Sequence, residues 1–485
     1  CSQKLAQVCL FGKTSFMEHA KSQNGFRNIL SIFSKVDLLA LVILCSTTFF
    51  MNADSGIISP NLSKIANDFG LNENQRDFMI GGQLSFISSV TAGISSITVG
   101  WFSANGWDTC KLLIMAILIG KVPALFSQYV ATFNQLITLR IFDGILNGSG
   151  FPLVLALMAE TFKVSKRNLL AGMVHLCYGL GGSIGLTSIA FFSDSLDWKL
   201  FFVLTAIPSL CTAFALLTFH KFLMKGQEHV TQINQETRSG KNYKSGSILG
   251  FRSYFSKVIL VVTTKTNFFC YLISVSACAY WGMNGTFVID FIRERGLGVQ
   301  GGSTLMLIFG LGTKTGAITG GFLAQCLYNK RPEHFARGFG VLRYCSLVPL
   351  LAMLNYDYAQ SAQVLKETNW LELKICAICF VGGWMAGMPG PQVGATIMNA
   401  TPSDLRPLAL TLLVLTDSTG SAIGPMLAGS LMPFFGREVV LNGCTLFWWI
   451  LSGSCFMAVS CFIRADVRNA TRKEEATKDV HDSEV

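Results

Sequence analysis

Charged residues inside otherwise apolar stretches are the side chains of this sequence most able to do chemistry. Asp54 lies in TTFFMNADSGIISP, and Arg140 and Asp143 lie in LRIFDGILNGSGFPLVLALMAETF. A carboxylate in an apolar setting can bind and release a proton, and a neighbouring arginine holds it ionised. We predict that Asp54 and Arg140 form either a proton-coupling pair or a static brace. Asp143 stands three residues from Arg140 and is expected to pair with it locally.

Other intramembrane polar residues are expected to play supporting parts. Lys314 and Asp417 would form a buried pair if they meet, and for that pair a structural brace is favoured over a gate. His175 is either a hydrogen-bonded core residue, which is the commoner outcome, or a proton relay. Lys121 has no partner that the sequence identifies.

Composition sets the class of protein that must position these groups. Of 485 residues, 51% are hydrophobic and 14% are charged, whereas soluble domains average about 25% charged residues. So little charge cannot solvate a globular surface of this size, which argues against a soluble enzyme, a coiled coil and a disordered scaffold. The chain is expected to be an integral, multi-pass protein of the lipid bilayer.

The apolar stretches divide the chain into two similar sets. A membrane-crossing helix needs about 20 mostly apolar residues. The sequence offers twelve such stretches, six before and six after the hydrophilic segment KGQEHVTQINQETRSGKNYKSGS. We expect an all-α membrane protein with an N-terminal tail at 1–35, a six-helix bundle at 36–220, a linker at 221–264, a second six-helix bundle at 265–463 and a C-terminal tail at 464–485. The expected helices are at about 36–58, 77–101, 110–130, 133–160, 168–193, 198–220, 265–291, 301–327, 336–354, 371–398, 405–432 and 440–463.

The basic residues predict the orientation of the chain. Lys and Arg are concentrated in both tails, in the linker and in the loops on the same side of the membrane. Short cytoplasmic loops carry such an excess, so both termini are expected in the cytoplasm. The net charge of +10 then reflects topology, and no nucleic-acid partner is expected. The opposite loops hold only Lys64, Arg76, Lys199, Arg293, Arg295, Lys366 and Arg437.

Motifs for catalysis or ATP hydrolysis are missing from the sequence. It contains no GxxxxGK[ST] or HExxH pattern and no soluble domain large enough to host catalysis. Cys376 and Cys379 form a CxxC, but no second Cys or His pair follows at the spacing of a zinc site. We therefore predict a gradient-driven transporter that is not an enzyme, with no cofactor and no metal site.

Two stretches resemble a known family of transporters. The segments FFMNADSGIISPNLSKIANDFGL and LRIFDGILNGSGFPLVLALMAETFKVSKRN are similar to the first and fourth helices of the Spinster-like lysolipid and sphingolipid transporters of the major facilitator superfamily. The resemblance covers roughly 36–195 and continues afterwards only in helix pattern. It implies the major facilitator fold, with Asp54 as the proton-binding carboxylate and Arg140 as its partner. Glu160 and Arg167 match charged residues at the cytoplasmic end of the fourth helix.

The same resemblance implies a secondary transporter that works by alternating access around a central cavity. Ser55 stands where the family has an Arg, and Asn147 where it has a Glu. We expect a monomer that carries an amphipathic or anionic small molecule such as a lysolipid, with protons as the coupling ion. A small polar organic anion or sugar is the alternative substrate, and a non-transporting receptor is the alternative function. The expected cavity residues are Asn147, Trp281, Asn284, Trp384 and Gln392.

Overall fold

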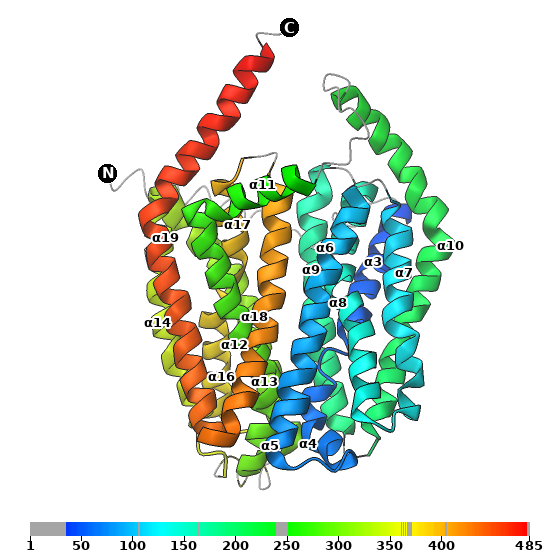
Figure 1. Cartoon of the computed structure of the whole chain (residues 1–485), viewed down its shortest axis with the longest axis vertical. Helices are drawn as coiled ribbons and strands as arrows, with labels where there is room; N and C mark the ends of the chain where they lie inside the picture. The colour runs from blue at the N-terminus through cyan, green and yellow to red at the C-terminus, as the bar shows by residue number, and fades with distance from the viewer. Residues whose placement is uncertain are drawn as a thin grey trace, which may run out of the picture.

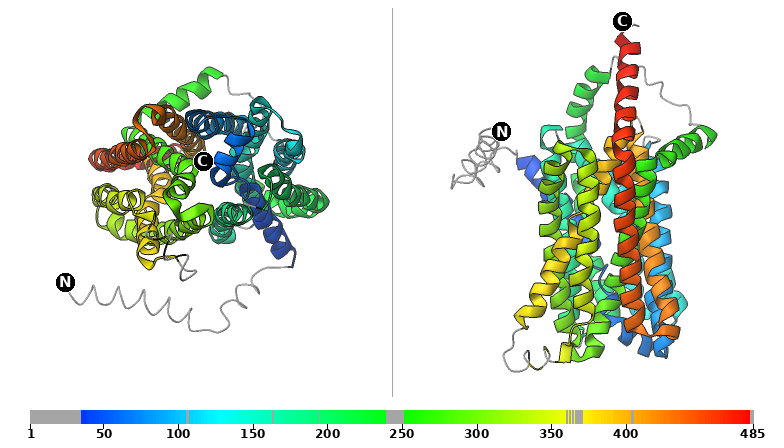
Figure 2. Two further views of the ribbon diagram at one scale, coloured as in Figure 1. Left: turned by 90° about the horizontal axis from the view of Figure 1, so that it is seen from below. Right: turned by 90° about the vertical axis from the view of Figure 1, so that its left-hand side faces the viewer.

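The helices of the chain run side by side in one elongated bundle (Figures 1 and 2). In Figure 1 the helices up to α10 lie on one side and those from α12 onward on the other. We call these the N-terminal and C-terminal halves. The computed structural model describes residues 35–482 apart from 105–106, 163, 194, 239–250, 360, 362, 364, 366–370 and 403–404.

The N-terminal half is built from long helices joined by short turns. Its last helix is by far the longest of the half and extends beyond the bundle in Figure 1. The elements of this half are α3 (Lys35–Asn52), α4 (Ile58–Asp68), α5 (Glu73–Gln75), the π-helical turn η1 (Arg76–Gln83), α6 (Leu84–Ala104), α7 (Thr109–Lys121), the 3-10 turn η2 (Pro123–Tyr129), α8 (Phe133–Thr161), α9 (Val164–Phe192) and α10 (Trp198–Arg238).

The C-terminal half follows a short helix, α11 (Phe251–Thr263), which lies across one end of the bundle. Its final helix, like α10, extends past that end. The elements of this half are α12 (Lys265–Ile292), the π-helical turn η3 (Arg293–Leu297), α13 (Gly298–Lys330), α14 (Pro332–Leu354), α16 (Leu373–Gly387), α17 (Gly390–Ala400), α18 (Arg406–Phe435) and α19 (Arg437–Asp482).

The helices are long and apolar enough to cross a bilayer. Within the described ranges, ten helical segments meet this criterion, and one of them, Lys265–Lys330, contains both α12 and α13. The shorter apolar helix Leu38–Asn52 begins the bundle. The predicted all-α membrane architecture is confirmed.

The two ends of the bundle are packed differently. At the end that contains α4 and η3, which we call the closed end, one buried apolar cluster includes residues of both halves, such as Leu62 and Phe287. At the other end, where α11 lies and which we call the linker end, each half has its own cluster. Because apolar burial is the main favourable term in packing, the halves are joined at the closed end and separate at the linker end.

The first expected helix differs from the structure. It is interrupted at 53–57, and the turn is closed by short-range bonds such as Ile57 N–H to the Asp54 carbonyl at 3.1 Å. Hydropathy could not predict this, because a turn inside an apolar stretch does not change its mean composition. Gly181 and Gly185 allow α9 to pack directly against the end of α3 and the start of the turn. A Cβ at Gly181 would overlap the backbone of Phe49, and one at Gly185 the backbone of Ala53.

The expected linker contains more helix than its composition indicated. Helix α10 continues to Arg238, and α11 occupies Phe251–Thr263. Contacts across the two halves are made by α6 with α18, α4 with α12, and α9 with α13.

Candidate functional site

Four buried charged side chains meet in the N-terminal half. Lys121 is fully buried and contacts both Asp54 and Asp143, the latter at 3.2 Å between Nζ and Oδ1. Arg140 Nη1 lies 2.9 Å from Asp143 Oδ2, which also accepts a hydrogen bond from Asn147 at 3.0 Å. We call Asp54, Lys121, Arg140 and Asp143 the charge cluster. It contains two cations and two anions, so its ionised form is neutral.

Local sequence places each member of the charge cluster. Asp54 lies in the turn between α3 and α4, where the chain is not helical. Lys121 is the last residue of α7, which ends before Pro123 because proline has no N–H to donate to a continuing helix. Arg140, Asp143 and Asn147 share one face of α8 through their spacing of three and four residues.

Two atoms of the charge cluster have no hydrogen-bond partner among the described residues. They are Oδ1 of Asp54 and Nε of Arg140. An unpaired polar atom in an apolar interior is unfavourable by about 1–3 kcal/mol. Asp54 Oδ1 can therefore accept a proton, and Arg140 can donate to a ligand, without breaking an existing bond.

Arg140 also borders a small cavity between the two halves. The cavity measures ≈ 50 Å³, and most of its lining side chains are hydroxyls or apolar groups. Arg140 is the only charged residue among them, so it supplies the one fixed charge of the lining. The lining residues are Ser55, Ile58, Ser59, Leu84, Ser85, Arg140, Gly285 and Thr286.

A second group of charges connects the halves at the closed end. Arg437 of α19 contacts Asp77 of η1 at 2.7 Å and Glu294 of η3 at 2.8 Å. Arg76 of the N-terminal half contacts Glu294 at 2.9 Å, and Asp290 lies 2.9 Å from Arg437. With three cations and three anions, this group is balanced. The closed-end network consists of Arg76, Asp77, Asp290, Arg293, Glu294 and Arg437.

The expected contact between Asp54 and Arg140 is indirect. No ion pair joins the two residues within the described ranges, because Lys121 contacts Asp54 and Arg140 contacts Asp143. The local pair of Arg140 with Asp143 has the geometry that the spacing predicts. The sequence prediction missed Lys121, since helix pattern alone does not tell which face of α7 meets Asp54.

Lys314 and Asp417, which would form a buried pair if they met, have different neighbours in the structure. Asp417 on α18 accepts hydrogen bonds from Ser274 and, at 3.3 Å, from Cys278, both on α12. Lys314 lies on α13, which faces α9 of the other half, and its side-chain end packs against Gly179. The two residues are therefore on helix faces that point to different neighbours.

The expected cavity residues occupy separate places. Asn147 joins the charge cluster, whereas Gln392 lines a different cavity of ≈ 300 Å³ near the linker end. Trp281 packs on Phe309 at 5.7 Å between ring centroids, within the core of the C-terminal half. Asn284 is buried on α12, and Trp384 packs against the apolar cluster of the C-terminal half.

The remaining predicted charges are dispersed. Glu160 accepts a hydrogen bond from Thr109 at 2.7 Å at the linker end of α8. His175 packs edge-on against Phe151, with 5.3 Å between ring centroids. Arg167 belongs to α9, and its side chain lies outside the described residues. No group of His, Cys, Asp and Glu in the described part of the chain has the arrangement of a metal site.

The closed-end network was not predicted from the sequence. Its arginines were assigned to loops, where isolated charges are usually solvated. The signal that could have revealed it is the density of opposite charges at helix starts and ends on one side, as in Arg76-Asp77 and Asp290-Phe291-Ile292-Arg293-Glu294.

Together, a membrane bundle in two halves and a charged cavity between them define a membrane carrier of small molecules. The sequence matches the model of the Major Facilitator Superfamily over residues 44–365, and the chain belongs to that superfamily. It is therefore a multi-pass secondary transporter and not an enzyme.

Known proteins of the superfamily resemble the chain in sequence and in fold. It is 23% identical over 379 residues to the sialic acid transporter NanX of Escherichia coli (strain K12), covering 78% of this chain and 83% of NanX. It is 24% identical over 306 residues to the hexuronate transporter of Bacillus subtilis (strain 168), covering 62% of this chain and 67% of that transporter. The fold is similar to that of a bacterial homologue of the human lysosomal transporter Spinster, solved in an inward-facing and unoccupied conformation. The two superimpose with a TM-score of 0.67 at 14% identity, covering 90% of this chain and 99% of the homologue.

Proposed function

We propose that the chain carries a small organic anion across the membrane together with protons, and that Arg140 binds the anionic group of the substrate. The observation that carries the proposal is the position of Arg140, which contacts the charge cluster on one side and borders the cavity between the halves on the other. A guanidinium has five N–H donors in a planar fork, so one edge can hold Asp143 while another binds a carboxylate.

In this state the cavity of ≈ 50 Å³ has room for the carboxylate group of a ligand and not for a whole sugar acid, and its lining favours a polar ligand. Ser55, Ser59, Ser85 and Thr286 can each donate and accept a hydrogen bond. Such groups suit a hydroxylated carboxylate better than an acyl chain, which would leave the hydroxyls without partners. Two relatives are named for sialic acid and hexuronate, which belong to this chemical class and support the choice.

Charge balance supplies the coupling between proton and anion. While Asp54 is ionised the charge cluster is neutral, and an added anion would leave the buried site negative. Protonation of Asp54 leaves the cluster with one net positive charge, which the bound anion neutralises. Each ligand therefore raises the affinity for the other, and the two bind together.

Packing at the two ends supports the carrier cycle. We assign the linker end to the cytoplasm, because α11 and the extended ends of α10 and α19, whose sequences carry many of the Lys and Arg residues of the chain, lie there. The halves separate at this end and are joined at the closed end, so the structure corresponds to an inward-facing state. To face outward, the halves must break the closed-end network and meet at the linker end.

Uptake into proteoliposomes tests the proposed substrate. Purified protein should take up radiolabelled D-glucuronate or sialic acid when the pH is lower on the side of the substrate. Arg140→Ala should abolish this uptake while the protein still elutes as a folded species. Lys111→Ala removes a cation whose side chain is largely exposed at 70%, and should leave uptake unchanged.

Competition separates the proposed substrate from a lysolipid. Unlabelled hexuronate should inhibit the uptake of labelled sialic acid, whereas lysophosphatidylcholine below its micellar concentration should not. Inhibition by the lysolipid alone, together with its own protein-dependent flux, would refute the organic-anion assignment. Ligand binding without any flux across a sealed membrane would identify a receptor.

A further inference from the structure

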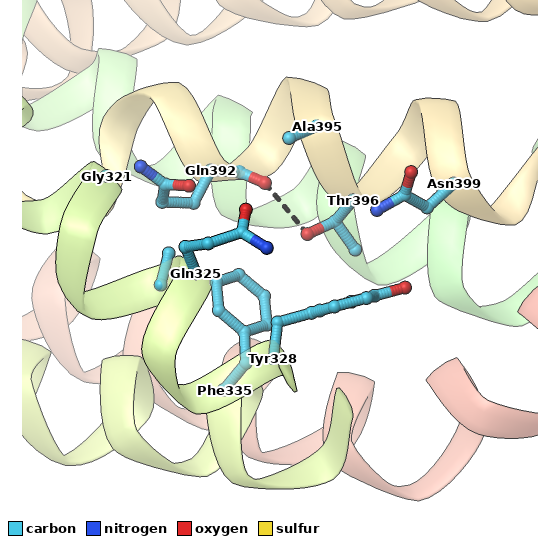
Figure 3. Close-up of a pocket in the computed structure, with 9 residues that line it drawn as sticks. Gly321, Gln325, Tyr328, Phe335, Gln392, Ala395, Thr396 and Asn399 are labelled. Atoms are coloured by element: carbon cyan, nitrogen blue, oxygen red, sulfur yellow. Dashed lines mark hydrogen bonds between the residues drawn. The ribbon is translucent and has the colours of Figure 1, made fainter. Parts of the chain in front are cut away.

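The cavity of ≈ 300 Å³ near the linker end belongs to the C-terminal half alone and is separate from the Arg140 cavity. Figure 3 shows its polar side chains, which come from α13 and α17, with an aromatic wall below them. None of the lining residues is charged. They are Gly321, Ala324, Gln325, Tyr328, Phe335, Gln392, Ala395, Thr396 and Asn399.

A change in helix packing opens this cavity. At Gly320, helix α13 lies so close to the segment between α16 and α17 that a Cβ would overlap the backbone of Met388. One residue later the approach ends, and the nearest atom to a Cβ at Gly321 is Nε2 of Gln392, at 3.9 Å. The α16 helix ends at Gly387 and α17 begins at Gly390, on either side of Met388 and Pro389, because proline does not continue a helix. The space between α13 and α17 follows from this interruption.

Gln392 is the side chain that points to a ligand. It is only 8% exposed, and its amide makes no hydrogen bond with any residue in the described part of the chain. The amide atoms are not enclosed by protein and face the cavity, where a ligand can reach them. Thr396 does not pair with the amide, since its hydroxyl donates to the main-chain carbonyl of Gln392 at 2.8 Å.

The other groups of the cavity complement Gln392. Gln325 is fixed by a hydrogen bond from its Nε2 to Asn329 Oδ1 at 2.7 Å, which leaves its carbonyl oxygen able to accept. The ring of Tyr328 packs edge-on against Phe335, with 6.1 Å between centroids, so the aromatic wall is held in place. In Figure 3 the Gln392 amide lies beside Gly321, the Gln325 amide points toward Thr396, and the Tyr328 hydroxyl extends toward Asn399.

This set of groups selects for hydroxyls rather than charges. A carboxamide both donates and accepts hydrogen bonds, as a hydroxyl does, so the two match in either direction. An ion in the same cavity would lose hydration without meeting an opposite charge. The cavity volume is at the lower end of the range for small-molecule sites, about 300–1,000 Å³.

We propose that this cavity, which we call the amide pocket, is a second binding site that takes an uncharged polyhydroxylated compound of the size of a monosaccharide or polyol. Its hydroxyls satisfy Gln392, Gln325 and Asn399, and its apolar face rests on Tyr328. The site is independent of the anion site, because it shares no residue with the Arg140 cavity.

Equilibrium binding to the full chain in lipid nanodiscs tests the amide pocket. The probes are radiolabelled D-glucose, D-mannitol and myo-inositol, and D-glucuronate serves as the charged counterpart of glucose. The measurement is made in Arg140→Ala, so that the proposed anion site does not contribute. We expect saturable binding of at least one neutral probe, and weaker binding of D-glucuronate than of D-glucose.

Two variants locate the binding. Gln392→Leu should weaken it about tenfold, the effect of losing hydrogen bonds to one amide. Gly321→Leu should abolish it, since the new side chain enters the pocket without meeting backbone. Gln300→Leu, which removes an exposed amide near the opposite end of α13, is the matched control and should bind normally.

The outcomes are distinct from those of the proposed function. Loss of neutral-probe binding in Gly321→Leu, with D-glucuronate uptake still dependent on Arg140, supports both sites. Absence of saturable binding for all three neutral probes overturns the amide pocket and leaves the anion site standing. Neutral-probe binding that survives both Gln392→Leu and Gly321→Leu overturns it as well.

Discussion

The two halves of the bundle hold their buried charges in different ways. In the N-terminal half, every member of the charge cluster contacts an opposite charge, and Lys121 and Asp143 each contact two. In the C-terminal half, Arg343 stacks 4.3 Å above the ring of Trp449 and donates to the carbonyl of Ala386 at 3.4 Å. Away from the closed-end network, this charge therefore interacts with neutral partners.

The same contrast holds for Asp417 and Lys314, which also lie away from the closed end. Asp417 is held by a hydroxyl and a thiol, and Lys314 has no carboxylate within ion-pair distance in the described residues. A charge that is added or removed in the N-terminal half changes the pairing of its neighbours. Away from the closed end of the C-terminal half, the same change affects only hydrogen bonds to neutral groups, so this region is suited to a fixed scaffold and the charge cluster to coupling.

Lys121→Met is expected to have the largest effect. It leaves two buried carboxylates with a single cation, and breaking a buried ion pair in this way destabilises a protein by about 3–5 kcal/mol. Thermal unfolding in detergent should show a large loss of stability. The double variant with Asp54→Asn restores the charge balance and should recover most of it. Wild-type stability of the single variant would contradict the role of Lys121 in the cluster.

Arg437→Gln is expected to have the next largest effect, at the place where charges of the two halves meet. It removes the contacts of Arg437 with Asp77 and Glu294, so the closed end should open more often. The cysteine of Ser85→Cys should then react faster with a membrane-impermeant maleimide added from the closed end than it does when Arg437 is present. Labelling of the native cysteines, measured without Ser85→Cys, is the background.

A matched arginine provides the control for that experiment. Arg295 forms its ion pair with Glu438 at 2.8 Å, inside the C-terminal half. Arg295→Gln should leave the labelling rate of the cysteine at Ser85 unchanged. Equal acceleration by both variants would mean that the closed-end network does not hold the halves together.

Arg343→Met is expected to have a smaller effect. Arg343 is almost fully buried, and its contacts in the described ranges are with Trp449 and a main-chain carbonyl, so an apolar side chain of similar length removes an unpaired charge. Replacing even a buried ion pair by apolar groups is often neutral or stabilising by about 1–4 kcal/mol, and here no anion is left behind. The thermal midpoint should stay the same or rise. A fall as large as that of Lys121→Met would remove the distinction between the halves.

Asp417→Asn should have the smallest effect. The amide oxygen still accepts the hydrogen bond of Ser274, and no cation loses a partner. Both stability and the pH dependence of uptake should match the unaltered protein. A changed pH profile would show that the C-terminal half also takes part in proton coupling.

The sequence predicted well what depends on composition and local spacing. Apolar runs indicate the membrane helices, and three-residue spacing indicates the pair of Arg140 with Asp143, because neighbouring positions on one helix face are fixed by helix geometry. Contacts between helices were harder to predict. Lys121 and Asp54 meet where α7 ends and where the chain turns after α3. Neither the helix end nor the turn changes the mean hydropathy of its apolar stretch, so hydropathy could not predict the contact.

The separation of Lys314 from Asp417 has the same cause. Opposite charges in one half suggest a contact, but the rotation of each helix about its axis decides which face meets which neighbour. The amide pocket could not be predicted from the sequence for a related reason. Gln392 was expected to line a cavity, but the sequence does not show that this cavity is separate from the one at Arg140.

The central claim is that protonation of Asp54 permits anion binding at Arg140, and the pH dependence of uptake by Asp54→Asn tests it most directly. Lower pH protonates Asp54 and makes the charge cluster positive, so uptake of D-glucuronate by the unaltered protein should increase as the pH on the substrate side falls. Asp54→Asn is fixed in the uncharged form, and its uptake should no longer respond to a pH gradient. Uptake by this variant that still rises with the imposed gradient, as in the unaltered protein, would contradict the account.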